Sequence, residues 1–554
     1  MNPAGIAAAV GALSLLSFFQ FPGHTWLQQD TQIYVAIMEH ERDPRVLAND
    51  ILVAESHVAF TLYDEIALAA RRITGLGFHE VLATQQLLTR ALGIWGLYLL
   101  ALSLLDGQAG LSLLVAAIVS LGATVTGPSV LIFEYEPSPR ALAYPLIMCG
   151  LGLAAAGWPR AAAMAGAIGL IYHPPSALPF CALLALLALR RRDFRSCLPM
   201  LAGIVLVAVS ASFQSQGAAG GFFRKLTPAD VRLLRMRAAY NWISTWGTSL
   251  ILHWLLVFGI ACGAWLRLSR RTVGGATNAC QEPAQAKGLL HDCGAGSLLM
   301  WLAVVGLASM PVSWLLLERS GWAFIPELQP MRNLLWTALA AQLLAAIAGI
   351  RAALRGSMAE SFAWLAAAFA FPVQDVFTRT WSWRHVLIVA GLAGLTAGLV
   401  WFAARRASRW APAVAAAAAF FAIPGWGQVV NYPRLHTPEL AQLAGWARSA
   451  TPRDAVFAFP DSGRVPYPGI FRAEALRAVY VDWKGGGQVN FLPHFATEWW
   501  FRWQQIMGQP ADLAKYDALG IRYVVLASPD RLPEPPVFEN ARFAVYRTGQ
   551  ELRP

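Results

Sequence analysis

The sequence is poor in charge and in cysteine. Only 14% of its 554 residues are charged, against about 25% in ordinary soluble domains, and 56% are hydrophobic. This deficit excludes an intrinsically disordered chain and argues against a conventional cytosolic enzyme. The six cysteines lie in apolar runs or beside basic loops and are absent from the polar tail, so they do not form a disulfide framework. No Gly-rich dinucleotide fingerprint follows any expected strand, and nothing indicates a soluble cofactor.

The sequence instead contains a series of apolar runs of spanning or near-spanning length. They lie near residues 4–22, 81–105, 109–127, 139–157, 198–213, 246–267, 297–317, 333–353, 358–374, 385–404 and 409–425. The segment 160–189 is interrupted by Pro174 and Pro175 and is expected to form two short helices, because proline ends a helix. The sequence therefore predicts a polytopic α-helical membrane protein with about 13 transmembrane helices.

The positive charges predict how the chain is oriented. Lys and Arg number 43 against 32 Asp and Glu, and such residues concentrate in cytoplasmic loops. With the N-terminus in the cytoplasm, thirteen crossings leave four basic clusters inside, near residues 190–195, 267–271, 351–355 and 405–409. The same count exports the loops 23–80, 128–138, 214–245, 318–332 and 375–384. We therefore attribute the basic excess to membrane topology and expect membrane lipid, not nucleic acid, as its partner.

The composition changes at about residue 430. Thr437 opens a helix that runs to about Ser449. Short apolar runs at 455–459, 478–482, 523–527 and 543–547 are typical of strands, and further helices are expected near 498–506 and 511–518. Alternation of strands and helices indicates a small α/β domain. The chain thus divides into a transmembrane domain over 1–429 and a periplasmic α/β domain over 430–554.

Carboxylates at the outer ends of the expected spans are candidate functional groups. Asp30 follows the first span, and Glu134 and Glu136 follow the third. Three carboxylates brought together from two loops would suit Mg²⁺ or Mn²⁺, which prefer oxygen ligands. The alternative is that these acids are solvated, or that they pair with Arg140.

Basic groups on the same side are candidate substrate contacts, and they are Arg140, His173, Arg332 and Lys484. Arg332 ends an outer loop where it could fork onto a phosphate or carboxylate, although a salt bridge with Glu318 or Glu327 is equally open. His173 lies at the Pro-Pro break, where a capping role competes with ligand contact. In the tail, Lys484 follows an expected strand, and open α/β sheets bind ligands at strand ends.

A basic amphipathic helix is expected around residues 228–240, with Arg232, Arg235 and Arg237 on it. It would either form a solvated charged face or contact an anionic lipid head group or a lipid-linked phosphate.

Taken together, these features resemble the C-type (GT-C) glycosyltransferases, especially the catalytic subunits of oligosaccharyltransferases. The matching features are an Asp soon after the first span, an acidic-x-acidic pair in the second outer loop, thirteen crossings and an exported α/β tail. The resemblance implies that Asp30, Glu134 and Glu136 bind a divalent metal, that Asp30 and Glu136 are catalytic, and that Arg332 holds a lipid-linked phosphate. Glu-x-Glu replaces the more usual Asp-containing pair, and Phe501 follows Glu498-Trp499-Trp500 where a Trp-Trp-Asp motif is expected, which argues against peptide glycosylation.

The function implied is a bacterial inner-membrane glycosyltransferase that moves a sugar from a polyprenyl-phosphate donor to a periplasmic acceptor, with Mg²⁺ or Mn²⁺ as cofactor. Two alternatives stay open. The first is a transporter or flippase of a lipid-linked or polar substrate, for which the broken segment at His173 is the visible feature. The second is a non-catalytic membrane assembly protein of the same fold.

Overall fold

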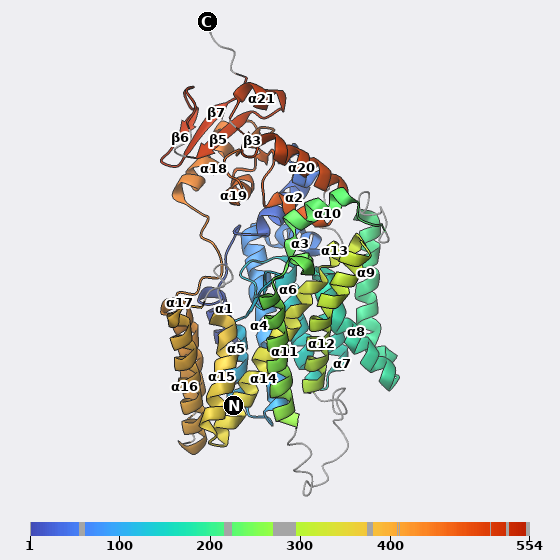
Figure 1. Cartoon of the computed structure of the whole chain (residues 1–554), viewed down its shortest axis with the longest axis vertical. Helices are drawn as coiled ribbons and strands as arrows, with labels where there is room; N and C mark the ends of the chain where they lie inside the picture. Colours follow the sequence, from blue (N-terminus) through green and yellow to red (C-terminus); the bar gives the residue numbers. More distant parts are fainter. Residues whose placement is uncertain are drawn as a thin grey trace.

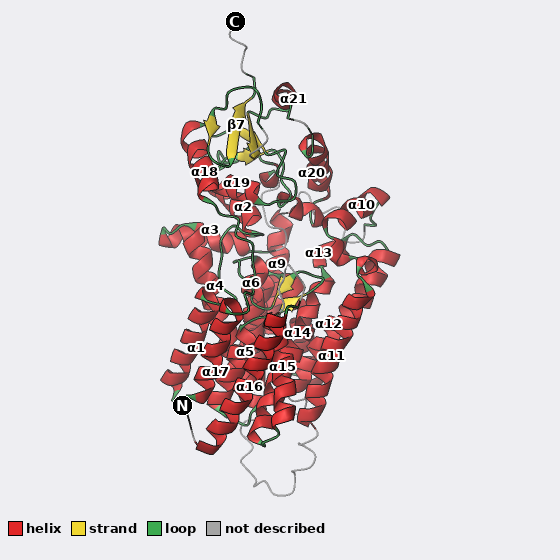
Figure 2. Ribbon diagram, turned by 60° about the vertical axis from the view of Figure 1, so that its left-hand side comes forward, coloured by secondary structure: helices red, strands yellow, loops and turns green. Residues whose placement is uncertain are grey.

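A computed structural model describes residues 2–54, 61–214, 224–269, 295–373, 381–406, 408, 410–509, 511–527 and 531–549. The chain forms a bundle of apolar helices with a small α/β domain beyond one end (Figure 1). The described chain begins, at residue 2, at the end of the bundle away from that domain (Figure 2).

Each apolar run predicted from the sequence contains a helix, and the break at Pro174 separates two helices as predicted. The bundle consists of α1 (Pro3–Phe19), α4 (Phe78–Leu104), α5 (Ala109–Ser120), α6 (Pro139–Ala155), α7 (Pro159–Tyr172), α8 (Pro174–Arg191), α9 (Leu198–Gln214), α11 (Thr248–Ser269), α12 (Ala295–Ser313), α14 (Leu334–Leu354), α15 (Met358–Val373), α16 (Trp383–Arg406) and α17 (Ala411–Gly425). By length and composition, 6 helical segments of the described chain suffice to cross a membrane, and several shorter apolar helices accompany them. A polytopic helical membrane protein is confirmed, and the count of thirteen crossings stays a prediction.

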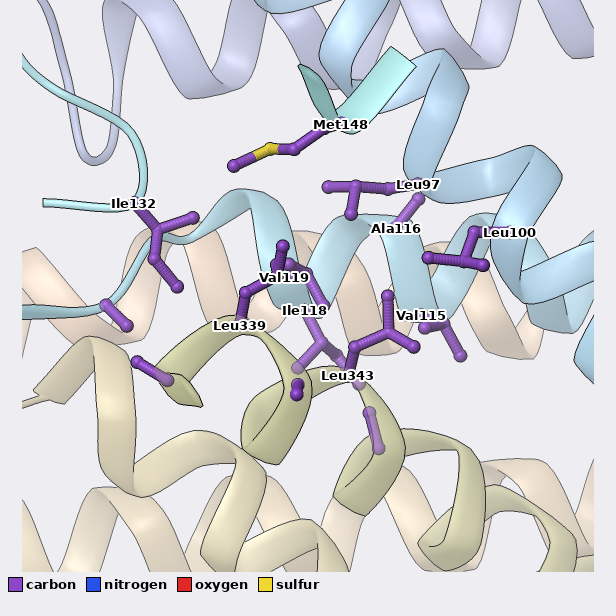
Figure 3. Packing of buried hydrophobic residues seen from close by; sticks show 14 of the residues in the cluster. Leu97, Leu100, Val115, Ala116, Ile118, Val119, Ile132, Met148, Leu339 and Leu343 are labelled. Atoms are coloured by element: carbon purple, nitrogen blue, oxygen red, sulfur yellow. The ribbon is translucent and has the colours of Figure 1, made fainter. Parts of the chain in front are cut away.

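The core of the bundle lies where α14 packs between its neighbours. Leu339 and Leu343 of α14 contact the side of the core formed by α5, which contributes Val115 and Ile118, and all four are buried (Figure 3). Close approach of α4 and α6 depends on small residues. A Cβ on Gly152 of α6 would overlap the backbone of α4, so the two helices pack with their backbones almost in contact.

Basic residues predicted on the cytoplasmic side gather at one end of the bundle. Arg267 at the end of α11 and Arg355 after α14 both pair with Glu360 of α15, at 2.7 and 3.2 Å. Arg351 pairs with Asp106, in the turn between α4 and α5, at 3.0 Å. These helix ends lie away from the C-terminal domain (Figure 1), which is the arrangement that the predicted orientation requires.

Short elements from the predicted outer loops lie between the bundle and the C-terminal domain (Figure 1). Those labelled there are α2 (Thr31–Arg42), α3 (Tyr63–Thr74), α10 (Pro228–Arg237) and α13 (Phe324–Leu328). The same loops contain η1 (Ile51–Val53), η4 (Ala239–Asn241), η7 (Pro330–Asn333) and a small hairpin of β1 (Thr124–Val125) and β2 (Val130–Leu131). The predicted basic helix corresponds to α10. Residues 55–60, 215–223 and 375–380 of the predicted outer loops lie outside the described residues.

The C-terminal domain is an α/β domain, as predicted. Its elements are α18 (Pro438–Ala450), β3 (Val456–Ala458), α19 (Tyr467–Ala475), β4 (Ala478–Val479), η8 (Gly485–Asn490), α20 (Pro493–Ile506), α21 (Leu513–Ala518), β5 (Tyr523–Ala527), β6 (Phe538–Glu539) and β7 (Phe543–Arg547). The sheet has the order β4-β3-β5-β7-β6. β3 runs parallel to β4 and β5, whereas β7 is antiparallel to β5 and β6. The four predicted strands correspond to β3, β4, β5 and β7, and α19 and β6 were not predicted.

A buried group of ions fastens this domain to the first outer loop. Arg472 of α19 donates to Asp50 at 2.6 Å and to Asp482 at 2.5 Å, and all three side chains are at most 1% exposed. Asp50 also accepts hydrogen bonds from the backbone of Val479 at 2.9 Å and of Leu52 at 3.0 Å. We call Asp50, Arg472 and Asp482 the buried bridge. Strand β4 ends before the predicted residue 482, because the chain there turns to bring Asp482 onto Arg472.

Candidate active site

A cluster of charged side chains lies at the start of α2, where the bundle, the first outer loop and the C-terminal domain meet. The Asp30 carboxylate pairs with Arg140 at 2.7 Å and with Lys484 at 2.6 Å. Lys484 also donates to the Gln29 side chain at 3.0 Å. The side chains of Asp30, Arg140 and Lys484 are 20%, 12% and 15% exposed, so solvent still reaches them. Two predicted substrate contacts, one from α6 and one from the C-terminal domain, therefore converge on Asp30.

Arg140 also binds Glu134, so that one guanidinium bridges two of the predicted carboxylates. Its Nε donates to Glu134 Oε1 at 2.8 Å, and the Leu131 backbone donates to the same oxygen at 3.3 Å. Arg90 of α4 stabilises the loop that carries Glu134, because its Nη2 donates to the Glu134 backbone carbonyl at 2.7 Å. We call Asp30, Arg140 and Glu134 the open bridge. The predicted alternative of ion pairing with Arg140 is what the structure shows for both acids.

Glu136 has a different environment and caps the start of α2. Its Oε1 accepts from the backbone of Gln28 at 2.5 Å, the backbone of Gln29 at 2.6 Å and the Thr31 hydroxyl at 2.9 Å, and its Oε2 accepts from the Thr31 backbone at 3.1 Å. Asp30, at the N-cap position, makes no side-chain cap bond of its own. Free N–H groups at a helix start need acceptors. Glu136 supplies these acceptors from a distant part of the sequence, which gives it a structural role at the start of α2, and its catalytic role stays a prediction.

The three predicted metal ligands approach one another, but their oxygens do not form a vacant oxygen shell. The Asp30 and Glu134 carboxylates face guanidinium and ammonium groups, and the Glu136 carboxylate faces four hydrogen-bond donors. In the part of the chain that the structure describes, no group of three or more His, Cys, Asp or Glu side chains is arranged to hold a metal ion. A divalent cation prefers oxygen ligands without competing cations. This donor set does not fit Mg²⁺ or Mn²⁺, and no step below is derived through a metal.

Arg332 lies in η7, beside Tyr240, and has an unused donor. Its guanidinium carbon lies 5.4 Å from the Tyr240 ring centre. Its Nε is buried and makes no hydrogen bond. Among the described residues no ion pair joins it to Glu318 or Glu327, the two alternatives from the sequence; Glu318 instead lies 3.9 Å from Arg235. An unsatisfied buried donor is costly, so Arg332 is poised for an acceptor that the described residues do not supply.

Arg237, at the end of α10, presents a second unused guanidinium donor. Its Nη2 donates to the Trp483 carbonyl at 2.8 Å, and its guanidinium lies 4.4 Å from the Trp483 ring centre. Its Nε is buried without a hydrogen-bond partner. Burial lowers the pKa of Arg237, and the nearby Tyr240 and Asp30 oppose that shift. The sequence singled out this helix but not this residue, because three arginines lie on it and only the fold shows which one turns inward.

His173 acts as a cap at the break between α7 and α8. Its Nδ1 lies 2.7 Å from the Ser176 hydroxyl and accepts from the Ser176 backbone at 3.3 Å. Burial, together with the positive charges of Arg332 and Arg140, lowers the pKa of His173 to about 3. The imidazole is therefore neutral at neutral pH. Its place near both arginines puts it beside the cluster, and its hydrogen bonds favour the capping role among the predicted alternatives.

The charges around Asp30 keep it ionised. Burial by itself raises the pKa of Asp30, but the charges of Lys484 and Arg140, the hydrogen bond from Lys484 and the charge of Arg332 together hold that pKa well below its usual value. Asp30 is thus held as a carboxylate in the folded protein, and its pKa would rise if a neighbouring cation moved away from it.

Comparison with known proteins gives three findings. A model of a domain of unknown function, DUF6798, matches residues 424–506. A search of curated proteins gives no match. Among solved structures, the chain is similar to ArnT from Cupriavidus metallidurans in the apo state, at 14% identity and a TM-score of 0.48, covering 98% of this chain and 96% of ArnT. It is also similar to the arabinofuranosyltransferase AftD from Mycobacteria, at 15% identity and a TM-score of 0.45, covering all of this chain and 42% of AftD.

Proposed function

We propose that this protein is a membrane glycosyltransferase of the C type, which moves a sugar from a polyprenyl-phosphate donor to an acceptor on the periplasmic side of a bacterial inner membrane. The observation that carries the proposal is the pair of buried, unused guanidinium donors of Arg332 and Arg237, both close to the Asp30 carboxylate. Guanidinium groups bind phosphate with paired, charge-assisted hydrogen bonds. A polyprenyl phosphate supplies the missing acceptor oxygens.

The cations outnumber the carboxylates that face them. Arg140 and Lys484 are taken up by Asp30 and Glu134, whereas Arg332 and Arg237 have no carboxylate within ion-pair distance in the described chain. The surplus positive charge lies at the bundle end nearest the C-terminal domain, where a lipid-linked head group would emerge from the membrane. Phosphate binding there neutralises the surplus and satisfies the two buried donors.

The reaction follows from these positions. The bond between the sugar C1 and the phosphate oxygen breaks, and the polyprenyl phosphate leaves with that electron pair, stabilised by Arg332 and Arg237. The acceptor hydroxyl oxygen forms the new bond to C1. Its proton passes to the Asp30 carboxylate, which orients the hydroxyl group. Lys484 turns from Asp30 towards the phosphate as the donor binds, and the basicity of Asp30 rises when it loses that partner.

Binding of undecaprenyl phosphate to the purified protein in nanodiscs tests the proposal. Arg332→Gln and Arg237→Gln should each weaken binding by about tenfold or more, because a hydrogen bond to a charged group contributes about 1.5–3 kcal/mol. Arg235→Gln is the matched control: Arg235 lies on the same helix, is 48% exposed and faces Glu318, so its loss should change binding by less than about twofold.

A transfer assay then separates a transferase from a flippase. Reconstituted protein given a labelled polyprenyl-phosphate sugar should release free polyprenyl phosphate and label an acceptor, and Asp30→Asn should stop the release. Wild-type binding by both glutamine variants would overturn the phosphate site. Movement of an intact donor across the bilayer without any cleavage would replace the transferase by the transporter alternative.

A further inference from the structure

A pocket lies between the first outer loop and the C-terminal domain, and none of the charged residues around Asp30 lines it. It has a volume of about 690 Å³, within the range of roughly 300–1,000 Å³ that small-molecule sites occupy. Its lining comes from residues 48–51 and Ala54, from α20, and from residues beside the strands: Val456 at the start of β3, Tyr480 directly after β4, and Leu519 and Gly520 between α21 and β5. Three parts of the chain that are far apart in sequence therefore build one cavity.

The base of the pocket is buried and aromatic, and its rim is polar and exposed. Tyr480 and Phe495 line the base and are 7% and 6% exposed. His494 and Glu498 of α20 are exposed at the rim, opposite Asn49. The Tyr480 hydroxyl donates to Gln505 at 2.6 Å. An aromatic base with a ring of hydrogen-bonding groups suits a ligand that has both an apolar face and many hydroxyl groups.

The charge of the lining disfavours an anion. Arg502 lies 4.8 Å from the Tyr480 ring centre and pairs with Glu498 at 2.6 Å. Asp50 is held in the buried bridge. The pocket therefore has no surplus positive charge for a phosphate or sulfate group, in contrast to the region around Arg332.

The strand pairing disfavours a peptide that adds to the sheet. Val456 lines the pocket from β3, which already pairs with β4 on one side and β5 on the other. An extended peptide needs a free strand edge. β3 has none to offer, and in the edge strand β4 the backbone N–H of Val479 already donates to Asp50. The polar rim in turn disfavours an acyl chain, since covering it would leave polar groups without partners.

We infer that this pocket binds a neutral saccharide and holds the acceptor chain of the reaction. The role of this saccharide as acceptor rests on the function proposed above, whereas saccharide binding itself rests on the pocket alone. The pocket is joined to the candidate active site through the chain: Tyr480 at its base precedes Lys484, which binds Asp30, and Asp50 in its wall belongs to the buried bridge. A saccharide bound here therefore contacts the same segment of chain that carries Lys484 to Asp30.

Calorimetric titration of the full chain in nanodiscs with cellotetraose, chitotetraose and α-1,6-mannotetraose tests the inference. At least one of these probes should give a saturable isotherm. Ala48→Trp fills the pocket from its exposed rim and Glu498→Ala removes a rim acceptor, and each should weaken that binding, the first by about tenfold or more. Ala441→Trp is the matched control, because Ala441 is exposed on α18 and does not line the pocket.

The two proposals fail in different ways. Ala48→Trp should leave undecaprenyl-phosphate binding unchanged, and Arg332→Gln should leave saccharide binding unchanged. Absence of binding by all three probes, or binding that Ala48→Trp and Ala441→Trp affect equally, overturns the saccharide site and leaves the donor site standing. The opposite result is that a saccharide binds while neither arginine variant weakens undecaprenyl-phosphate binding. That result overturns the donor site and leaves the pocket as a saccharide-binding site.

Discussion

The open bridge and the buried bridge have the same chemical composition and opposite surroundings. In each, one arginine joins two carboxylates, and one of those carboxylates belongs to the first outer loop. The acids and the arginine of the buried bridge are at most 1% exposed, and each of its four carboxylate oxygens accepts a hydrogen bond. In the open bridge the arginine and Asp30 are 12% and 20% exposed, and further cations stand beside them.

This difference in exposure points to a structural role for the buried bridge and to the proposed functional role for the open bridge. Charges removed from water are retained only where partners compensate them. In the buried bridge all four carboxylate oxygens are taken up, and although Arg472 Nη1 has no hydrogen-bond partner, side chains that are at most 1% exposed leave no opening for a ligand. The buried bridge therefore fastens the C-terminal domain. The open bridge keeps an ionised carboxylate in reach of solvent, next to arginines with unused donors, which is what ligand binding requires.

The largest expected effect comes from breaking the buried bridge. Arg472→Met should destabilise the protein by about 3–5 kcal/mol, because two buried carboxylates lose their shared cation. Thermal unfolding in detergent measures the loss. The exposed pair of Arg502 and Glu498, at 22% and 51% exposure, provides the control: Arg502→Gln should cost no more than about 1 kcal/mol. Equal losses for the two variants would refute the distinction between the bridges.

Asp30→Asn tests the open bridge, and the expected effect is on reaction and not on folding. Transfer should fall by about 100-fold or more, the usual contribution of a proton acceptor, while undecaprenyl-phosphate binding does not weaken, because a negative charge has been removed. Since the pKa of Asp30 in the free protein lies well below its usual value, the ratio of wild-type to variant kcat/KM, which reports the free enzyme, should be the same at about pH 5 as at neutral pH. Asp43→Asn on the same outer loop is the control.

Glu136→Gln should affect folding more than chemistry. An amide cannot accept from all four donors that face the Glu136 carboxylate, so one buried donor loses its partner, at a cost of about 1–3 kcal/mol. Glu80→Gln, at an exposed position on α4, should leave the melting temperature unchanged. Complete loss of transfer with an unchanged melting temperature would restore the catalytic role that the sequence predicted.

The smallest effect is expected from metal removal. Because cations already occupy the positions around Asp30 and Glu134, treatment with EDTA should change neither the melting temperature nor the binding of undecaprenyl phosphate. Isothermal titration with Mg²⁺ and Mn²⁺ gives an independent readout. A stoichiometric heat of binding that Asp30→Asn abolishes would show that the carboxylates rearrange around a metal after all.

Much of the fold was predictable because the signals are local. Apolar runs mark helices, since a chain in lipid must satisfy its backbone groups within each segment, and Pro174 marks the end of α7 because it cannot continue that helix. The strands of the C-terminal domain were equally visible as short apolar runs. Helix α19 was missed because Pro468 and Gly469 lie in its first turn and obscure the pattern.

The candidate site was predictable only in part. The sequence drew attention to Asp30, Glu134 and Glu136 as acids at helix ends, but it did not show that Glu136 would face the start of α2 while Asp30 and Glu134 share Arg140. The choice among Arg232, Arg235 and Arg237 depended on which way α10 turns against Trp483.

The sequence by itself thus determined a charge-poor helical membrane domain, an α/β tail and the residues able to carry chemistry, because transfer free energy and backbone preferences act over a few neighbouring residues. Only the tertiary structure decided which charges meet. Lys484 reaches Asp30, and Arg472 reaches Asp50, across nearly the whole chain. Such pairings follow from packing and desolvation in the folded protein, since the energy of an ion pair depends on its burial and its neighbours and not on its position in the sequence.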